Sequence, residues 1–199
     1  MRPELYVFAK RPDMGRAKTR LARDIGVTHA QRIARAMMSK ILRNVTDPRW
    51  DTYVYATPIR AIGNEPIWDR FEQVAQPSGS LTPRLAATYS GRRRPVIVIG
   101  TDCPQVTARD IADALKALKR ADLVFGPASD GGFWLMAAMA PLPIGTFDNV
   151  SWSSDRTLRD LQSNLQGRVA TLRTLTDIDD GQALRSIRPD RNLRRFRPW

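Results

Sequence analysis

The chain is poor in cysteine, histidine and long apolar runs, and each scarcity excludes a class of protein. Cys103 is the only cysteine among 199 residues, so no intramolecular disulfide can form, which fits a reducing compartment. His29 is the only histidine and falls in the first turn of a predicted helix, which excludes a histidine-based metal site and a Ser-His-Asp triad. No apolar run approaches the length of a transmembrane segment, and the N-terminus lacks an apolar signal region. We therefore expect a cytoplasmic protein.

Acidic residues are also scarce relative to basic ones. The chain has 32 lysines and arginines against 20 aspartates and glutamates, a formal net charge of +12. Much of the excess lies in the last fifteen residues, 185–199, which hold six arginines, and in the run Arg92–Arg94. Zinc-finger spacing, a recognition helix and an aromatic RNA-binding motif are all missing. We interpret 185–199 as a solvated basic tail and do not favour nucleic acid as the partner.

The first motif of the chain is a basic loop between a predicted strand and a predicted helix. The apolar run 5–10 ends in a loop that contains Pro12 and Gly15, and helix-forming residues resume at Thr19. The loop brings five cations to the end of a strand, where phosphate is favoured: Lys10, Arg11, Arg16, Lys18 and Arg20. Ala17 stands where a Walker A loop needs glycine, so a P-loop ATPase is disfavoured. The alternative is a basic surface loop that binds nothing.

Predicted strands and helices alternate along the rest of the chain. Strands are expected at 51–57, 71–75, 96–99, 122–125 and 169–172, and helices at 28–44, 82–89, 107–119 and 155–165. The run 96–99 is apolar on both faces, as in a central parallel strand covered by helices. This alternation predicts one α/β domain over residues 1–184, with a mostly parallel central sheet flanked by helices.

Carboxylates follow two of these strands. Asp102 comes just after 96–99, and Asp177 and Asp179 come after 169–172. Carboxylates at the carboxyl ends of strands suit Mg²⁺ or Mn²⁺, and such an ion would neutralise phosphates held by the basic loop. Considered alone, Asp102 is as consistent with an aspartate that stabilises a turn or caps a helix as it is with a metal ligand. Cys103 is disfavoured as a nucleophile because no histidine base is available.

Five blocks of sequence together resemble a known bacterial family. They are Phe8-Ala9-Lys10 through Gly15 to Lys18-Thr19-Arg20-Leu21, Gly100-Thr101-Asp102-Cys103-Pro104, Gly126-Pro127-Ala128 to Asp130-Gly131-Gly132, Trp152-Ser153 to Thr157-Leu158, and Asp177-Ile178-Asp179. This order resembles a family assigned as glycosyltransferases and long labelled a domain of unknown function. The family lies in the GT-A-like nucleotide-diphospho-sugar transferase superfamily, near the 2-phospholactate guanylyltransferases. The resemblance implies a Rossmann-like GT-A fold.

The resemblance also implies roles for individual residues. It places Lys18 and Gly15 at the nucleotide phosphates, and the position of Lys10 and Arg20 in the basic loop predicts that they bind the nucleotide as well. It makes Asp102 a catalytic metal ligand together with Asp177 or Asp179. The acceptor side would be formed by Asp130, Gly131, Gly132, Trp152 and Ser153. Two blocks depart from the family pattern, since Asp102-Cys103-Pro104 replaces Asp-x-Asp and Gly79-Ser80-Leu81 replaces Gly-Asp-Leu, which leaves Gly79 and Arg84 as candidates for nucleoside contacts.

These observations favour a metal-dependent transferase that uses a nucleotide or nucleotide-sugar and an unidentified small-molecule acceptor. Two reactions stay open, namely transfer of a glycosyl group and transfer of a nucleotidyl group from an NTP to a phosphorylated acceptor. A hypothesis of another class is a basic nucleic-acid-binding or regulatory module on a degenerate transferase fold. The joint presence of Lys18, Asp102 and the later acidic pair favours an enzyme.

Overall fold

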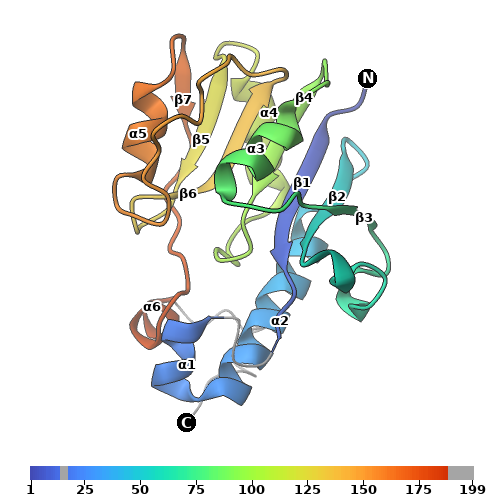
Figure 1. Ribbon diagram of the computed structural model, residues 1–199, viewed down its shortest axis with the longest axis vertical. Coiled ribbons are helices and arrows are strands. Elements are labelled where there is room, and N and C mark those ends of the chain that lie inside the picture. The colour runs from blue at the N-terminus through green and yellow to red at the C-terminus, as the bar shows by residue number, and fades with distance from the viewer. Residues whose placement is uncertain (14–17, 188–199) are drawn as a thin grey trace.

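Seven strands form one sheet in the computed structural model, which describes residues 1–13 and 18–187 (Figure 1). The strands are β1 (Glu4–Lys10), β2 (Asp51–Thr57), β3 (Glu72–Ala75), β4 (Pro95–Ile99), β5 (Leu123–Pro127), β6 (Phe133–Met139) and β7 (Val169–Thr171). The helices are α1 (Thr19–Ile25), α2 (Val27–Val45), α3 (Leu81–Tyr89), α4 (Ala108–Ala117), α5 (Thr157–Ser163) and α6 (Gly181–Ser186), with short 3-10 turns at Ile59–Ala61 and Pro66–Trp68.

The sheet is mostly parallel, as the sequence predicts. Its order is β3-β2-β1-β4-β6-β5-β7, and only the pairings of β6 with β4 and β5 are antiparallel. β6 is not among the predicted strands, because the loop expected after 122–125 runs on to Leu135. The turn Asp130-Gly131-Gly132 between two apolar runs is the hairpin signal that could have revealed it.

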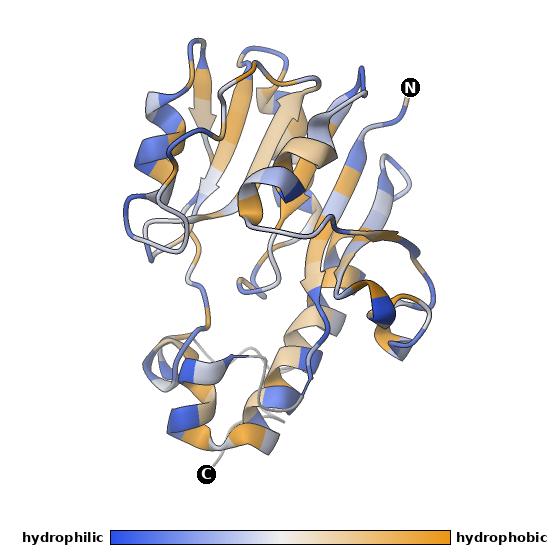
Figure 2. Cartoon of the chain, in the orientation of Figure 1, coloured by the Kyte–Doolittle hydropathy of each residue, from blue (hydrophilic) through white to orange (hydrophobic). Residues whose placement is uncertain are grey.

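Helices cover both faces of the sheet, so successive strand residues are buried on opposite sides. On one face, Val7 and Ile97 pack in a cluster with residues of α2 and α4. On the other face, Tyr6 and Val98 pack with residues of α3 and α5. Figure 2 shows the strands at the centre of the sheet as largely hydrophobic and the outer side of α5 as hydrophilic. The central position of β4 between two helical layers explains why its sequence is apolar throughout.

A third, smaller cluster joins α1, α2 and α6 beyond the carboxyl edge of the sheet (Figure 1). Its buried core includes Leu21, Ile33 and Ile178, and Leu184 and Ile187 pack against it. The described fold therefore continues three residues past the predicted domain end at 184. The rest of the predicted tail, 188–199, lies outside the described residues. No helix in the described part is long and apolar enough to cross a membrane.

Candidate active site

A pocket of about 710 Å³ opens at the edge of the sheet where the parallel strands end. This is the edge at which open α/β sheets bind ligands, and the strand order reverses here between β1 and β4. Most of the predicted site residues line the pocket: Lys10, Lys18, Arg20, Asp102, Asp130, Gly132, Trp152, Ser153, Asp177 and Asp179. The fold thus gathers at one place residues that lie far apart in the sequence.

Three predicted site residues that the structure describes, Gly79, Arg84 and Gly131, do not line the pocket. Gly15 lies outside the described residues, and Gly131 supports the turn beside the pocket without lining it. Gly79 and Arg84 are also absent from the lining, and an Arg84 Nη1 donates to Gln76 Oε1 at 3.3 Å instead. The α3 region contributes Leu81 and Leu85 to the pocket wall, so its contribution is apolar and not cationic.

Lys18 lies between two carboxylates at the floor of this pocket. Its Nζ is 2.5 Å from Asp102 Oδ1 and 2.5 Å from Asp179 Oδ1. The lysine side chain is only 10% exposed, whereas those of Asp102 and Asp179 are 53% and 40% exposed. The backbone of Lys18 is left-handed, with φ of 51°, immediately before α1. Such a conformation costs a non-glycine residue about 1–3 kcal/mol and is typical of functional sites.

The ion pairs keep Lys18 charged although it is buried. Burial lowers the pKa of the Lys18 ammonium, but the neighbouring carboxylates of Asp102 and Asp179 outweigh burial, and the net shift of the pKa is upward. At neutral pH the ammonium is therefore a fixed positive charge on the pocket floor.

The segment after β7 brings Asp179, and not Asp177, into contact with Lys18. The amide of Ile178 donates to the carbonyl of Asp102 at 2.9 Å, which ties the segment after β7 to the end of β4. Asp179 Oδ1 lies 2.5 Å from Lys18 Nζ, whereas Asp177 Oδ1 accepts a hydrogen bond from Ser129 Oγ at 2.9 Å. Of the two later metal-ligand candidates, Asp179 is thus the one beside Asp102.

The carboxylates of Asp102 and Asp179 fit a divalent cation. Their Oδ1 atoms both touch Lys18 Nζ, so they lie no farther apart than twice 2.5 Å. Carboxylate oxygens are the hard ligands that Mg²⁺ and Mn²⁺ prefer. No group of three or more histidine, cysteine, aspartate or glutamate residues that could hold a metal occurs among residues 1–13 and 18–187. An ion here would complete its coordination with water and substrate phosphates, as Mg²⁺ usually does.

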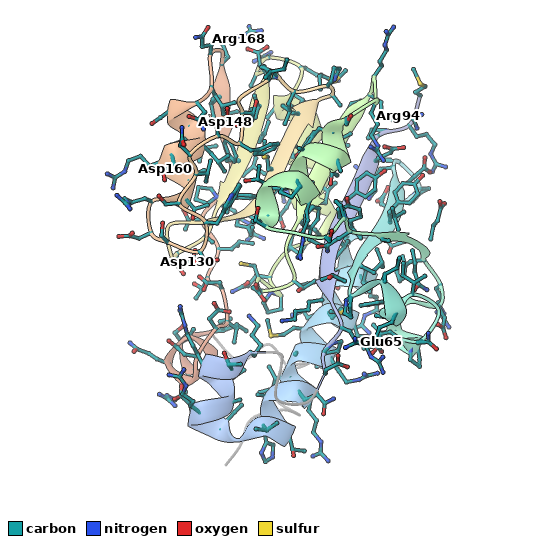
Figure 3. All side chains as sticks on the ribbon, in the orientation of Figure 1. Glu65, Arg94, Asp130, Asp148, Asp160 and Arg168 are labelled. Atoms are coloured by element: carbon teal, nitrogen blue, oxygen red, sulfur yellow. The ribbon has the colours of Figure 1, made fainter. Side chains whose placement is uncertain are left out.

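The turn between β5 and β6 holds Asp130 at the pocket wall (Figure 3). Gly131 has φ of 87°, and a Cβ there would lie 2.3 Å from the carbonyl oxygen of Asp155, so only glycine fits. The amide of Gly132 donates to Asp130 Oδ1 at 2.9 Å and fixes the carboxylate. Partial burial raises the pKa of Asp130, and the negative charges of Asp177 and Asp179 raise it further.

The loop before α5 closes the same side of the pocket. Trp152 Nε1 donates to Thr82 Oγ1 at 2.8 Å, which joins this loop to α3. Ser153 has φ of 59°, a second left-handed non-glycine residue in the pocket lining. The hydrogen bond of Trp152 therefore links the loop before α5 to α3, and Ser153 lies beside it in the lining.

Several residues of the pocket lining are not among the predicted site residues. Phe8, Phe133 and Trp134 line the pocket. Their positions near the start or end of a strand are the sequence feature that could have indicated a place in the site. Cys103 also lines it but is only 3% exposed, and burial together with the charge of Asp102 raises the pKa of its thiol. A protonated, buried thiol is consistent with the argument against a cysteine nucleophile.

Comparisons with known proteins agree with this fold. The model of the family described as "Uncharacterized protein conserved in bacteria (DUF2064)" matches residues 41–154. The phosphoenolpyruvate guanylyltransferase of Chloroflexus aggregans is 28% identical over 183 residues, which cover 85% of this chain and 89% of that protein.

Two solved structures illustrate the fold similarity. A protein of Desulfovibrio desulfuricans G20, provisionally described as a nucleotide-diphospho-sugar transferase, superposes with a TM-score of 0.78 at 22% identity and covers 90% of this chain and 84% of its own. The 4-diphosphocytidyl-2C-methyl-D-erythritol synthase of Anaerococcus prevotii has a TM-score of 0.61 at 8% identity, with coverage of 92% and 94%. The C. aggregans relative is named as a guanylyltransferase, and the comparisons confirm the predicted family, fold and enzyme class.

Proposed function

The chain belongs to the DUF2064 family of bacterial proteins, and we propose that this transferase moves a nucleotidyl group from an NTP to a phosphate-bearing acceptor. The observation that carries the proposal is the position of Lys18 between Asp102 and Asp179 on the floor of the pocket. One cation and two carboxylates at a single point are suited to hold a phosphate chain and the ion that accompanies it.

The wall formed by β1 and α1 suits the triphosphate. Lys10, Lys18 and Arg20 line this side, and together they offset the charge of the phosphates. Leu81 and Leu85 provide an adjoining apolar surface for the nucleoside. In this arrangement the α-phosphate lies over the pocket floor, and the acceptor approaches from the wall that contains Asp130 and Trp152.

Asp102 and Asp179 would hold a divalent ion, Mg²⁺ or Mn²⁺, and this ion would neutralise negative charge on the phosphates. Lys18 itself provides a second, permanent positive charge, and its burial keeps it in place. When phosphates enter, the Lys18 ammonium exchanges part of its contact with the carboxylates for contact with phosphate oxygens.

The reaction needs no protein nucleophile. An oxygen of the acceptor's phosphate forms a bond to the α-phosphorus, and the bond from that phosphorus to the bridging oxygen breaks. The electron pair of the broken bond leaves with pyrophosphate, whose charge Lys10, Lys18 and Arg20 stabilise. The residues therefore act by positioning the two reactants and by compensating charge.

Two observations favour this reaction over glycosyl transfer. Asp102 is a single carboxylate after β4, in Asp102-Cys103-Pro104, where many GT-A glycosyltransferases have Asp-x-Asp. The named sequence relative, at 28% identity, is a guanylyltransferase. Glycosyl transfer would release a nucleoside diphosphate and not pyrophosphate, so the products of the two reactions differ.

The test is a product assay on the full chain with Mg²⁺ or Mn²⁺. Each of the four NTPs is incubated with a panel of phosphorylated acceptors and pyrophosphate is measured, while nucleotide-sugars are assayed for released nucleoside diphosphate. We expect pyrophosphate with at least one NTP, strong loss of it in Lys18→Met, and no loss in Lys116→Met, which removes an exposed lysine of α4. Nucleoside diphosphate from a nucleotide-sugar, without pyrophosphate from any NTP, would refute nucleotidyl transfer.

A further inference from the structure

The charges that line the pocket are divided between two walls. Lys10, Lys18 and Arg20 lie on the side of β1 and α1, whereas Asp130 and Asp177 lie on the side of the β5–β6 turn and the segment after β7. Among the described residues that line the pocket, every lysine or arginine comes from the segment 10–20. The second wall, which faces the acceptor in the proposed reaction, is therefore acidic.

Among residues 1–13 and 18–187, no cation neutralises the carboxylates of this second wall. Asp130 Oδ1 accepts from the amide of Gly132 at 2.9 Å, and Asp177 Oδ1 accepts from Ser129 Oγ at 2.9 Å. Within residues 1–13 and 18–187, no ion pair joins either carboxylate to a lysine, arginine or histidine. Each carboxylate thus retains acceptor capacity toward a molecule in the pocket.

Aromatic side chains complete the same wall. Phe133, at the start of β6, and Trp152, in the loop before α5, both line the pocket and are partly exposed. The hydrogen bond from Trp152 Nε1 to Thr82 Oγ1 fixes the indole. A fixed aromatic surface next to carboxylates can cover the C–H face of a ligand while the carboxylates accept hydrogen bonds from its hydroxyl groups.

We infer that the acceptor carries its phosphate on an uncharged, polyhydroxylated body, as a sugar phosphate does. This inference rests on the proposed nucleotidyl transfer and names the acceptor class for it. Asp130 then orients the body through hydroxyl groups and disfavours an acceptor with a second anionic group, because a ligand carboxylate at this wall would face the Asp130 carboxylate. Phosphoenolpyruvate, which gives the relative from C. aggregans its name, has such a carboxylate.

The experiment compares acceptors in the full chain with the NTP that gives pyrophosphate. Glucose 1-phosphate and mannose 1-phosphate are assayed against phosphoenolpyruvate and phosphocholine. We expect kcat/KM for a hexose phosphate to exceed the values for the other two by about tenfold or more, the effect of one good hydrogen bond to a charged group. Asp130→Asn should raise the KM for that hexose phosphate by about tenfold, leave the Kd for the NTP unchanged and narrow the preference over phosphoenolpyruvate.

The control variant is Asp113→Asn, which removes an exposed carboxylate of α4 that does not line the pocket, and it should behave as the wild type. Equal use of all acceptors, or a preference for phosphoenolpyruvate or phosphocholine, would overturn the inference and leave nucleotidyl transfer intact. Absence of pyrophosphate with every NTP would instead refute the proposed function. The acceptor class would then be tested by measuring Tm with and without a hexose phosphate. A rise in Tm with hexose phosphate that Asp130→Asn abolishes would support the acceptor class, and no rise with either hexose phosphate would refute it.

Discussion

Replacing Lys18 by methionine tests the charge cluster, because methionine keeps the apolar stem and removes only the ammonium. The variant loses two contacts of 2.5 Å, with Asp102 and Asp179, and leaves their carboxylates close together. Charge-assisted hydrogen bonds contribute about 1.5–3 kcal/mol each when well shielded. Here both carboxylates are substantially exposed and regain water, so the surface range of about 1 kcal/mol or less per pair applies.

We therefore expect Lys18→Met to lower the free energy of unfolding by about 1–2 kcal/mol, which for a chain of this size lowers Tm by roughly 2–8 °C. Urea unfolding followed by tryptophan fluorescence measures the first quantity. Since the pKa of Lys18 is raised above its usual 10.5, the stabilisation is fully present below that pH and is lost as the pH rises through the higher value in the folded state. The difference between wild type and variant should thus be constant from pH 6 to 9 and shrink only in strong alkali.

Ligand binding separates this explanation from a purely structural role. Lys18→Met should bind NTP more weakly but should bind Mn²⁺ alone more tightly than the wild type, because the ammonium no longer competes for Asp102 and Asp179. Calorimetry gives both affinities, and Lys116→Met serves as the matched control. An unfolding free energy equal to that of the control, together with unchanged NTP affinity, would refute the reasoning.

Four further outcomes follow from the same geometry. Asp102→Asn removes the negative charge from one of the two ion pairs of Lys18, so stability without ligand should fall and Mn²⁺ affinity in the presence of NTP should drop, and equal affinities in calorimetry would make Asp102 a turn residue. Gly131→Ala should destabilise by about 2 kcal/mol or more in urea because a Cβ would meet the backbone of Asp155, and wild-type stability would contradict this close approach. Because its pKa is raised, ionised Asp130 disfavours folding, so Asp130→Asn should raise Tm at pH 7 with a gain that disappears near pH 3.8, and a pH-independent Tm difference would exclude this cause. Truncation after Ile187 should leave a folded, active enzyme, since Ile187 completes the packing on α1 and α2, and a folded but inactive product would assign a function to the tail.

The sequence predicts the layered fold well where hydrophobic patterning is strong. β2 spans Asp51–Thr57, which is the predicted range. β4 spans Pro95–Ile99 and so begins one residue before the predicted strand 96–99. β6 was harder to predict, because Phe133–Met139 contains no β-branched residue and its leucine, methionines and alanines favour helix as much as strand. α6, at six residues, is too short for a helical period to be recognised.

The candidate site was predictable in composition but not in arrangement. Strand-end positions indicated Lys18, Asp102 and the later acidic pair, because parallel strands bring their carboxyl ends to one edge. The sequence could not indicate which of Asp177 and Asp179 contacts Lys18, because Asp179 is 161 residues from Lys18 and no local pattern connects the two positions. Gly79 and Arg84 were proposed from family resemblance, and their side of the pocket is instead formed by apolar residues of α3.

The pairing of Lys18 with Asp102 and Asp179 also explains how one edge can collect residues for both phosphate and metal. Considered separately, the basic loop would repel itself and the two aspartates would repel each other, and each set would need an external ligand of opposite charge. The strand order places β1 beside β4, so the segment after β1 supplies the cation and the segments after β4 and β7 supply the carboxylates. Lys18 then compensates charge on both carboxylates in the folded chain. A bound phosphate can replace the carboxylates as the partner of Lys18, and a bound divalent cation can replace Lys18 as the partner of the carboxylates. Binding of either ligand alone must break the Lys18 ion pairs, whereas binding of both replaces them, so nucleotide and metal should bind cooperatively at this site.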